Sequence, residues 1–324
     1  MASEFLIKME HFKSYHSELI KQTAKKAGFE LVGIAKAEAL PEEFERYQEW
    51  LASGYHATMQ YLEKNLEKRK DIREILPGAE SVIVVGLSYY TPHSHRDSKE
   101  EGKISRYAWG TDYHEILPMK MQEIVSVLQS IDPDSQSKVY VDTGPIPEKQ
   151  WARKAGIGWQ GKNSNIISRE IGSWFFLGVI ITTIPLDYDS PMEDYCGTCT
   201  ACLDACPTNA IIEPYKVDAN KCISYWTIEA KPHIEIPTEI ATNMEQWVYG
   251  CDICQDICPW NRFSSESSIQ EFQPRNNETG LTFHSILEMK QEDFSDRFRK
   301  SPVKRTKLAG LQRNVIALQS NEDE

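Results

Sequence analysis

The feature that most constrains this chain is the placement of its cysteines. All eight lie between positions 196 and 258 of a 324-residue sequence, and the remainder of the chain has none. A disulfide framework spreads its bridges through a small secreted domain, and this chain has neither that size nor that distribution. The eight thiols are therefore expected to bind metal within one part of the chain.

Two cysteine groups are recognised by their spacing. The first is C-x2-C-x2-C-x3-C-P, the run found in bacterial ferredoxins, in which the fourth cysteine ligates the other of two clusters. The second is C-x2-C-x3-C-P, and Cys222 stands alone upstream of it. A cubane needs four thiolates, and a short loop wraps only three of them. Reciprocal sharing therefore predicts one [4Fe–4S] cluster on Cys196, Cys199, Cys202 and Cys258, and a second on Cys206, Cys222, Cys251 and Cys254.

Zinc is the competing metal, because C-x2-C pairs also suit a tetrahedral Zn²⁺ site. The ferredoxin spacing, together with a Cys-Pro closure on each group, favours iron–sulfur. Two clusters ligated in this way form a short electron wire. Residues 186–265 are accordingly predicted to be a ferredoxin-like module with two [4Fe–4S] clusters.

The 185 residues before this module exceed what an electron carrier needs, so they are expected to hold the chemistry. Apolar runs and helical spacing alternate along them, which predicts an α/β or α+β body with a mixed sheet. Residues 266–324 are predicted to form a C-terminal helical segment. The expected helices are 15–28, 41–52, 114–128 and 151–155, and the expected strands are 29–34, 81–87, 138–141 and 174–183.

Three loops of the body have unusual compositions for simple connections. Residues 141–145 place Asp142 directly after a strand, where an aspartate is ordinarily a turn or cap residue. Residues 156–164 hold three glycines that let the backbone approach a ligand closely. Residues 106–114 are dense in aromatic and charged side chains. Beside an electron wire, the three loops indicate a pocket for a large organic cofactor.

The net charge of −12 argues against a general nucleic-acid binder, because phosphates reward lysine and arginine. One run near the C-terminus is basic in spite of the acidic net charge. It is either a solvated helical face or a local phosphate-binding patch. No stretch approaches the ~20 apolar residues of a membrane span, and no secretory signal is recognised, so a cytoplasmic protein is expected. The basic run near the C-terminus comprises Arg297, Arg299, Lys300, Lys304, Arg305 and Lys307.

Together, the loops and the cysteine pattern resemble the epoxyqueuosine reductase family of tRNA-modification enzymes. The segments that carry the resemblance are ISRYAWGTDYHEIL, YVDTGPIPEK, KAGIGWQGKNSNIIS, GSWFFLGVIITT, CGTCTACLDACPTNAI, DANKCISYWTIE and YGCDICQDICPWNRF. The resemblance implies that the chain reduces epoxyqueuosine to queuosine at the wobble position of tRNA. It also implies a cobalamin-binding body, over 1–185, related to that of reductive dehalogenases.

Particular residues acquire roles through this resemblance. Asp142 of the VDTGP segment is implied as the proton donor, which suits the opening of an epoxide. The basic run is then better interpreted as a contact to the tRNA backbone, and a ferredoxin or flavodoxin is the expected electron donor. For Ile166 and Leu177, ordinary core packing is an equal explanation. The implied cobalamin contacts are Arg69, Ser105, Asp142, Ile166, Leu177, Ser224, Cys251 and Asp252.

Two alternatives from other classes remain open at this point. One is an enzyme like the reductive dehalogenases, acting on a small organic halide; the absence of an export signal and the basic run speak against it. The other is a non-catalytic electron-transfer subunit, against which the large body and Asp142 speak. Cobalamin binding discriminates between the enzyme and the subunit.

Overall fold

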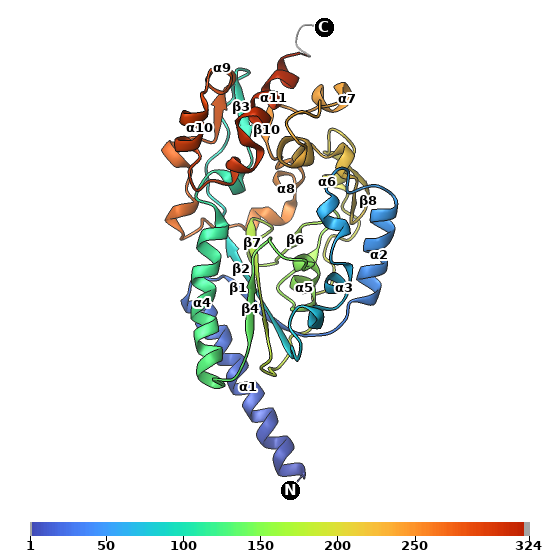
Figure 1. Ribbon diagram of the computed structural model, residues 1–324, viewed down its shortest axis with the longest axis vertical. Coiled ribbons are helices and arrows are strands. Elements are labelled where there is room, and N and C mark those ends of the chain that lie inside the picture. The colour runs from blue at the N-terminus through green and yellow to red at the C-terminus, as the bar shows by residue number, and fades with distance from the viewer. Residues whose placement is uncertain (1, 321–324) are drawn as a thin grey trace.

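A four-stranded antiparallel sheet lies at the centre of the computed structural model, which describes residues 2–320 (Figure 1). Strand β2 consists of the apolar run SVIVVGLS, and all eight of its residues are buried. It pairs with β1 along one edge and with β7 along the other, so it is a central strand, as its composition predicts. The order is β1 (Leu31–Lys36), β2 (Ser81–Ser88), β7 (Phe175–Thr182) and β4 (Ser137–Tyr140).

Helices cover both faces of this sheet. Helices α1 (Ala2–Lys26) and α4 (Tyr113–Ile131) lie side by side on one face (Figure 1). Helix α5 (Glu148–Lys154) packs on the other face, with Trp151 almost fully buried. Two further helices, α2 (Pro41–Ala52) and α3 (Leu66–Lys70), follow the first strand. Each face therefore has its own hydrophobic core, and the sheet is a rigid support for the loops at its ends.

The start of α4 is fixed by its cap. The Asp112 side chain accepts a hydrogen bond from the backbone N–H of His114 at 3.0 Å, which satisfies one of the free donors of the first turn. Buried residues at helical spacing, among them Leu117, Met121 and Leu128, hold the helix against the sheet. This combination places Tyr113 and His114 at a defined position in the first turn.

A second, three-stranded sheet lies above the first (Figure 1). Its strand β10 runs parallel to β3, whereas β11 is antiparallel to β3, so this sheet is mixed. Segments far apart in the sequence share its core, which includes Trp109, Tyr249 and Leu311. The strands of this sheet are β10 (Trp247–Tyr249), β3 (Glu101–Ile104) and β11 (Gly280–Thr282). Three helices contribute residues to the same core: α9 (Phe283–Leu287), α10 (Gln291–Arg297) and α11 (Lys307–Gln319).

The cysteine-bearing part of the chain has only short regular elements. Within residues 195–261, no helix or strand that the structure describes is longer than five residues. A π-helical turn, Tyr225–Glu229, follows the lone Cys222. The elements are α6 (Ala201–Asp204), β8 (Ile211–Glu213), β9 (Lys216–Val217), α7 (Thr238–Ala241), β10 and α8 (Ile253–Asp256), and the hairpin β5 (Trp159–Gln160)–β6 (Ile166–Ile167) precedes them.

The expected α+β architecture is confirmed, and the mixed sheet is the three-stranded one. The glycine-rich loop differs from expectation in one respect. A side chain at Gly158 would meet the backbone oxygen of Ile167 at 2.5 Å, so this close approach is to strand β6 rather than to a ligand. The cores cross the predicted domain boundaries, since Phe272 packs into the core of the central sheet. The boundaries at 185/186 and 265/266 stay a prediction. No helix within residues 2–320 has the length and hydropathy to cross a membrane.

Candidate active site and cluster-binding segment

A cavity of about 1040 Å³ opens where the central sheet meets the cysteine segment and the C-terminal region. Residues from all three regions line it, including Asp142 after β4, Cys222 before the π-helical turn, and Arg305 near α11. Ligand pockets commonly enclose about 300–1,000 Å³. The cavity is therefore large enough for a bulky organic cofactor or a nucleotide.

Asp142 is held in the cavity through both its side chain and its main chain. The hydroxyl of Tyr113 donates to Asp142 Oδ2 at 2.9 Å, and Nε2 of His114 lies 3.9 Å from the same oxygen. The backbone of Asp142 has φ of +54°, in the left-handed region that favours glycine. Its N–H donates to Glu148 Oε1 at 2.7 Å. These bonds hold a carboxylate that is 60% exposed to the cavity and solvent.

Glu148 and Tyr113 were not predicted as site residues. Burial, and then the charge of Asp142, raises the pKa of Glu148 to about 8, so this carboxyl holds its proton at neutral pH. It therefore binds the Asp142 backbone without placing a full second negative charge beside that carboxylate. Burial and Asp142 also raise the pKa of Tyr113, which keeps its phenol a donor. Tyr113 belongs to the unusual loop 106–114 and Glu148 to the YVDTGPIPEK segment, but only the fold shows that they converge.

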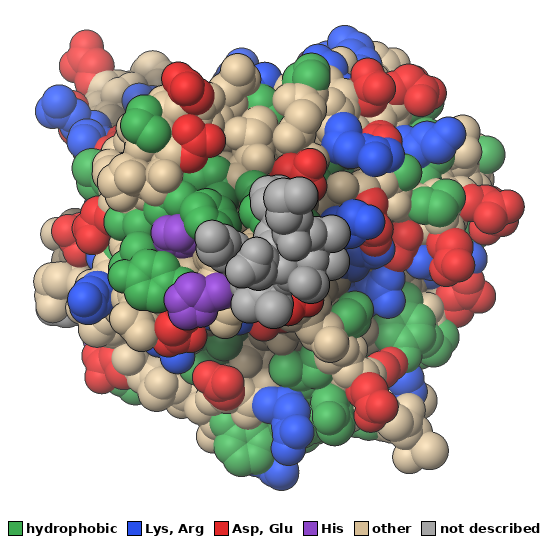
Figure 2. Space-filling view, turned by 90° about the horizontal axis from the view of Figure 1, so that it is seen from below, with side chains coloured by type: hydrophobic (Ala, Val, Ile, Leu, Met, Phe, Trp, Pro, Cys, Tyr) green, Lys and Arg blue, Asp and Glu red, His purple; other side chains and the backbone are tan. Residues whose placement is uncertain are grey.

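Four residues of the basic run line the cavity: Arg299, Lys300, Lys304 and Arg305. Lys300 pairs with Glu115 at 2.8 Å, and Arg305 pairs with Glu229 at 2.8 Å. We call these four residues the cationic rim. By contrast, acidic and basic side chains are interspersed over the visible part of the face at the N-terminal end of the molecule (Figure 2).

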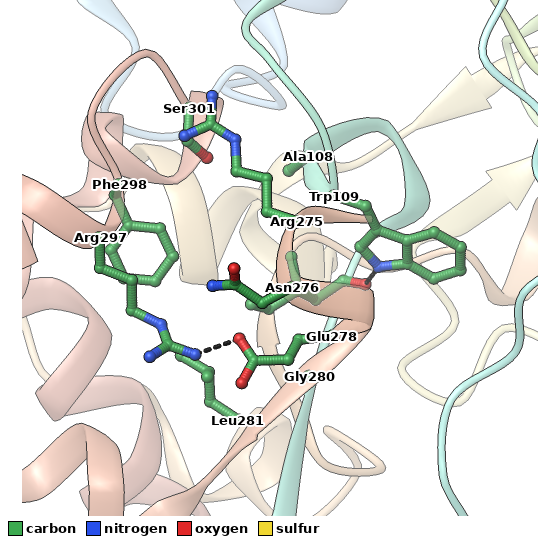
Figure 3. Close-up of a pocket in the computed structure, with 11 residues that line it drawn as sticks. Ala108, Trp109, Arg275, Asn276, Glu278, Gly280, Leu281, Arg297, Phe298 and Ser301 are labelled. Carbon is green, nitrogen blue, oxygen red and sulfur yellow. Dashed lines mark hydrogen bonds and ion pairs between the residues drawn. The ribbon is translucent and has the colours of Figure 1, made fainter. Parts of the chain in front are cut away.

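The two remaining residues of the basic run do not line this cavity. Arg297 points into a separate small pocket, where it forms an ion pair with Glu278 (Figure 3). In the same pocket Arg275 donates to the backbone oxygen of Lys300, at 2.5 Å, and so anchors the loop that carries the cationic rim. Lys307 follows the rim at φ of +62° and does not line the cavity either.

The structure separates the residues implied as cobalamin contacts. Asp142 and Ser224 line the cavity, but the other six do not. Ser105 donates its hydroxyl to the buried Asp252, whose pKa burial raises to about 7. Ile166 lies in the core beneath the sheet, as does the partly buried Leu177. Two further implied contacts lie outside the lining: Arg69, over the ring of Tyr47 at 5.7 Å, and the partly buried Cys251.

Neighbouring thiols lie close enough to raise one another's pKa, while their division into the two predicted ligand sets stays a prediction. Burial and the neighbouring thiols of Cys196, Cys258 and Cys199 raise the pKa of Cys202 to about 11. These four are the predicted ligands of the first cluster. Thiols that crowd in this way resist ionisation unless positive charge lies among them, which is what iron supplies.

The second set shows the same crowding. Burial, and then the thiols of Cys254 and Cys222, raises the pKa of Cys251. Burial also raises the pKa of Cys222, with a further contribution from Cys206. The two sets approach each other at Cys254, whose pKa is raised by burial and by thiols that include Cys202. Thiols from both predicted sets thus lie near one another, and the assignment of each thiol to a cluster stays a prediction.

The two cysteine sets face different surroundings. Cys222, from the second set, lines the cavity that contains Asp142. Cys199, from the first set, is exposed on the surface. The indole N–H of Trp159 donates to Cys196 Sγ at 3.4 Å. One set thus borders the cavity, and the other borders solvent.

This combination defines a class: an iron–sulfur oxidoreductase whose two-cluster segment adjoins a cavity with a fixed carboxyl group. Residues 195–261 match the family described as a 4Fe-4S double cluster binding domain. Residues 69–143 match the family described as epoxyqueuosine reductase QueG, DUF1730.

Curated relatives give the particular family. An epoxyqueuosine reductase from Synechocystis sp. is 50% identical over 277 residues, which are 85% of this chain and 95% of the relative. One from Leadbetterella byssophila is 47% identical over 93% of this chain and 97% of its own length. The chain belongs to the epoxyqueuosine reductase family.

Solved structures agree with this assignment. A crystal structure of epoxyqueuosine reductase with an epoxyqueuosine-modified tRNA-Tyr stem loop matches with a TM-score of 0.87 and 32% identity, over 94% of this chain and 80% of the other. The Bacillus subtilis epoxyqueuosine reductase matches with a TM-score of 0.86 and 30% identity, over the same shares. That structure is described as having its catalytic aspartate loop swung out of the active site. The predicted family, an oxidoreductase activity and the two-cluster domain are confirmed.

Proposed function

We propose that this enzyme reduces the epoxide of epoxyqueuosine at the wobble position of tRNA to the alkene of queuosine. The observation that carries the proposal is the single cavity that joins Asp142, Cys222 and the cationic rim. An acid, an electron route and a phosphate-binding surface are the three things that this reaction needs. The family membership supports the substrate, since a related enzyme is known with a modified tRNA stem loop.

Asp142 is proposed as the proton donor. Conversion of an epoxide to an alkene consumes two electrons and two protons and releases the oxygen as water. The carboxyl of Asp142, fixed by Tyr113 and Glu148, is proposed to deliver a proton to the epoxide oxygen as the carbon–oxygen bond breaks. The left-handed backbone of Asp142 is a local strain of the kind that accompanies functional side chains.

Cobalamin is the proposed organic cofactor, and the cavity of about 1040 Å³ lies at the upper end of the volumes of ligand pockets. When bound, cobalamin supplies a low-potential metal centre for the reduction. Asp142 and Ser224 are the implied contacts that line the cavity and would face it. The six others would act only through neighbouring segments, as Ser105 and Asp252 do by fixing the backbone of Arg106 at 2.7 Å.

The tRNA is proposed to dock on the cationic rim. Phosphates near the anticodon would meet Arg299, Lys300 and Lys304 while the wobble base enters the cavity. Aromatic side chains in the lining, Tyr113 and Tyr225 among them, suit an unstacked base. An acidic protein must bind RNA through such a local patch. Arg297, already paired with Glu278, is assigned a smaller share.

Electrons are proposed to pass from a ferredoxin or flavodoxin through the first cluster to the second, and then into the cavity at Cys222. The exposure of the cysteines supports this direction, because Cys199 meets solvent whereas Cys222 meets the cavity. The ligand sets proposed for the clusters are those of the cysteine spacing, which the crowding of the thiols supports.

The test is an anaerobic assay with the purified enzyme. The protein is reconstituted with iron and sulfide, cobalamin is added, and an epoxyqueuosine-containing anticodon stem-loop is supplied with dithionite. Mass spectrometry of the nucleoside then measures the loss of one oxygen. Conversion that depends on cobalamin supports the proposal as a whole. No conversion despite full clusters and bound cobalamin would move the enzyme to another substrate.

A further inference from the structure

The exposed end of the cysteine segment carries a cluster of aromatic rings. Trp159, which donates to Cys196 Sγ, packs against Tyr195 and Trp260 with ring centroids 5.3 and 5.0 Å away. Phe263 extends this cluster outward, 5.8 Å from Trp260. Trp159 is buried, but Tyr195 is 37% and Phe263 is 44% exposed. The rings thus connect a proposed ligand of the first cluster to the surface.

Two arginines flank the exposed rings. The guanidinium of Arg169 lies 4.9 Å from the ring centre of Tyr195, and that of Arg262 lies 4.6 Å from the ring centre of Phe263. Both side chains are exposed. Among the residues that the structure describes, neither arginine is ion-paired, unlike Arg297 and Arg305 of the C-terminal region. We call Tyr195, Trp260, Phe263, Arg169 and Arg262 the aromatic–arginine face.

The loop beneath this face is firmly held. The ammonium of Lys162 donates to the backbone oxygens of Gly197 and Cys199 at 2.7 and 2.9 Å. Asp194 is exposed, and its carboxylate accepts from the backbone N–H of Cys196 at 2.6 Å and from the hydroxyl of Tyr215. Glu170 and Glu193 are exposed and lie close in sequence to Arg169 and Tyr195, and within residues 2–320 neither forms an ion pair. The face is therefore preorganised, and its two stacked guanidiniums are the charges at its apolar centre.

We propose that the aromatic–arginine face is the docking surface for a small, acidic one-electron carrier protein. Arginine and aromatic side chains at the centre of a patch are the composition of energetic hot spots in protein interfaces. The carrier's carboxylates would pair with Arg169 and Arg262 while its cofactor edge faces the rings. This rests on the proposed function only in that the clusters feed the cavity.

Charge explains why the carrier would be acidic and dock at this place. The chain has a net charge of −12, so at long range it repels an acidic partner. A local pair of free arginines then selects both the partner and the position. Each docking event oxidises the carrier by one electron and reduces one cluster by one electron. Two events supply the two electrons that epoxide reduction consumes.

The cavity itself is a poor alternative entry point. Cys222 lies in its wall, but the substrate must occupy the same cavity. An exposed Cys199 and a ring cluster on Cys196 give a separate entry at the first cluster. The carrier and the tRNA then bind different surfaces, so one need not leave before the other arrives.

The experiment measures the carrier and the clusters without tRNA. The double variant Arg169→Glu/Arg262→Glu is compared with Lys25→Glu/Lys26→Glu, which makes the same charge change on exposed residues at the end of α1. Anaerobic titration with a bacterial flavodoxin gives the Kd, and stopped-flow absorbance gives the rate at which flavodoxin hydroquinone reduces the clusters. Dithionite serves as the small reductant in a parallel measurement.

The proposal expects the arginine variant to bind flavodoxin at least about tenfold more weakly, to be reduced correspondingly more slowly, and to lose most of the salt dependence of binding. Its reduction by dithionite stays normal, which shows that the clusters are intact, and the lysine variant behaves like the wild type. Equal losses in both double variants would mean that only net charge matters, and an unchanged arginine variant would place the entry elsewhere; either result overturns the proposal. Epoxide reduction driven by dithionite is unaffected in every case, so its failure would count against the proposed function instead.

Discussion

The central sheet and the cysteine segment are stabilised in different ways. In the sheet, β2 is buried along its whole length, and helices cover both faces. In the cysteine segment, α6 and α8 are only four residues long and partly exposed. Apolar burial therefore holds the first region, whereas the second combines a smaller apolar core, which includes Ile223 and Met244, with the ligation of its proposed clusters. The proposed reaction site lies where the central sheet meets the cysteine segment.

The largest expected effect comes from removing one cysteine ligand of a cluster. Cys206→Ser should remove the second cluster and abolish turnover, because Cys206 belongs to that set although it lies in the first sequence motif. Cys258→Ser is the reciprocal control and should remove the first cluster. Iron analysis and electron paramagnetic resonance measure which cluster is lost. Loss of the first cluster in Cys206→Ser would break the shared-ligand assignment.

Next in size is the loss of the acid. Asp142→Asn should lower turnover by about 10²–10⁴-fold, since an amide retains the hydrogen-bond partners but cannot donate the proton. Cluster and cobalamin absorbance should be unchanged, which separates the chemical role from folding. Asp296→Asn, at an exposed carboxylate of α10, is the matched control. Normal turnover in Asp142→Asn would remove Asp142 from the mechanism.

The third prediction tests whether apolar burial stabilises the central sheet independently of the clusters. Ile83→Ala, at a fully buried position of β2, should lower the free energy of unfolding by about 2–5 kcal/mol while the cluster spectra stay unchanged. Ile316→Ala, at a side chain that is 55% exposed, should change it little. Urea denaturation under anaerobic conditions gives both values. Cluster loss in Ile83→Ala at temperatures where the sheet remains folded would contradict the division between the two regions.

The smallest effect concerns Glu148. Its pKa rises from an ordinary 4.5 to about 8 in the fold, so the folded state keeps a proton that the unfolded chain has released. The free energy of unfolding should therefore fall as pH rises through this window, and Glu148→Gln should lack that component. The slope is less than the ~1.4 kcal/mol per pH unit of a fully buried group, because water reaches part of the side chain.

The measurement compares urea midpoints at pH 6 and pH 8.5 in the wild type and the variant. Glu45→Gln, at an exposed position on α2, is the control and should follow the wild type. Parallel pH profiles for wild type and Glu148→Gln would show that Glu148 ionises normally. In that case the Asp142 backbone would be held by an ordinary carboxylate.

Much of this arrangement was accessible from the sequence, for physical reasons. The run at 81–87 predicts a buried strand because only such a strand hides consecutive β-branched residues. The cysteine spacing predicts two clusters because it reflects ligand geometry. Strand order was not accessible, since an apolar strand does not specify its partner. Glu148 was missed because its role depends on the backbone of Asp142, which no local pattern shows.

The basic run illustrates the same limit. Its six charges are equivalent in the sequence, but Arg297 ends α10 and turns toward Glu278. Lys300 then adopts a left-handed conformation, at φ of +57°, and the chain after it faces the cavity. One backbone turn thus divides the run into the partly buried ion pair of Arg297 with Glu278 and the cationic rim. The charge pattern alone predicts a patch but not which of its members face outward.

The position of Cys222 in the cavity wall bears on how the enzyme tolerates air. Dioxygen can reach the cluster segment from two sides, at the exposed Cys199 and through the open cavity at Cys222. A bound stem-loop would close the second route and leave the first. Substrate binding would then protect the cluster nearest the reaction, and oxidative damage during turnover would begin at the other one.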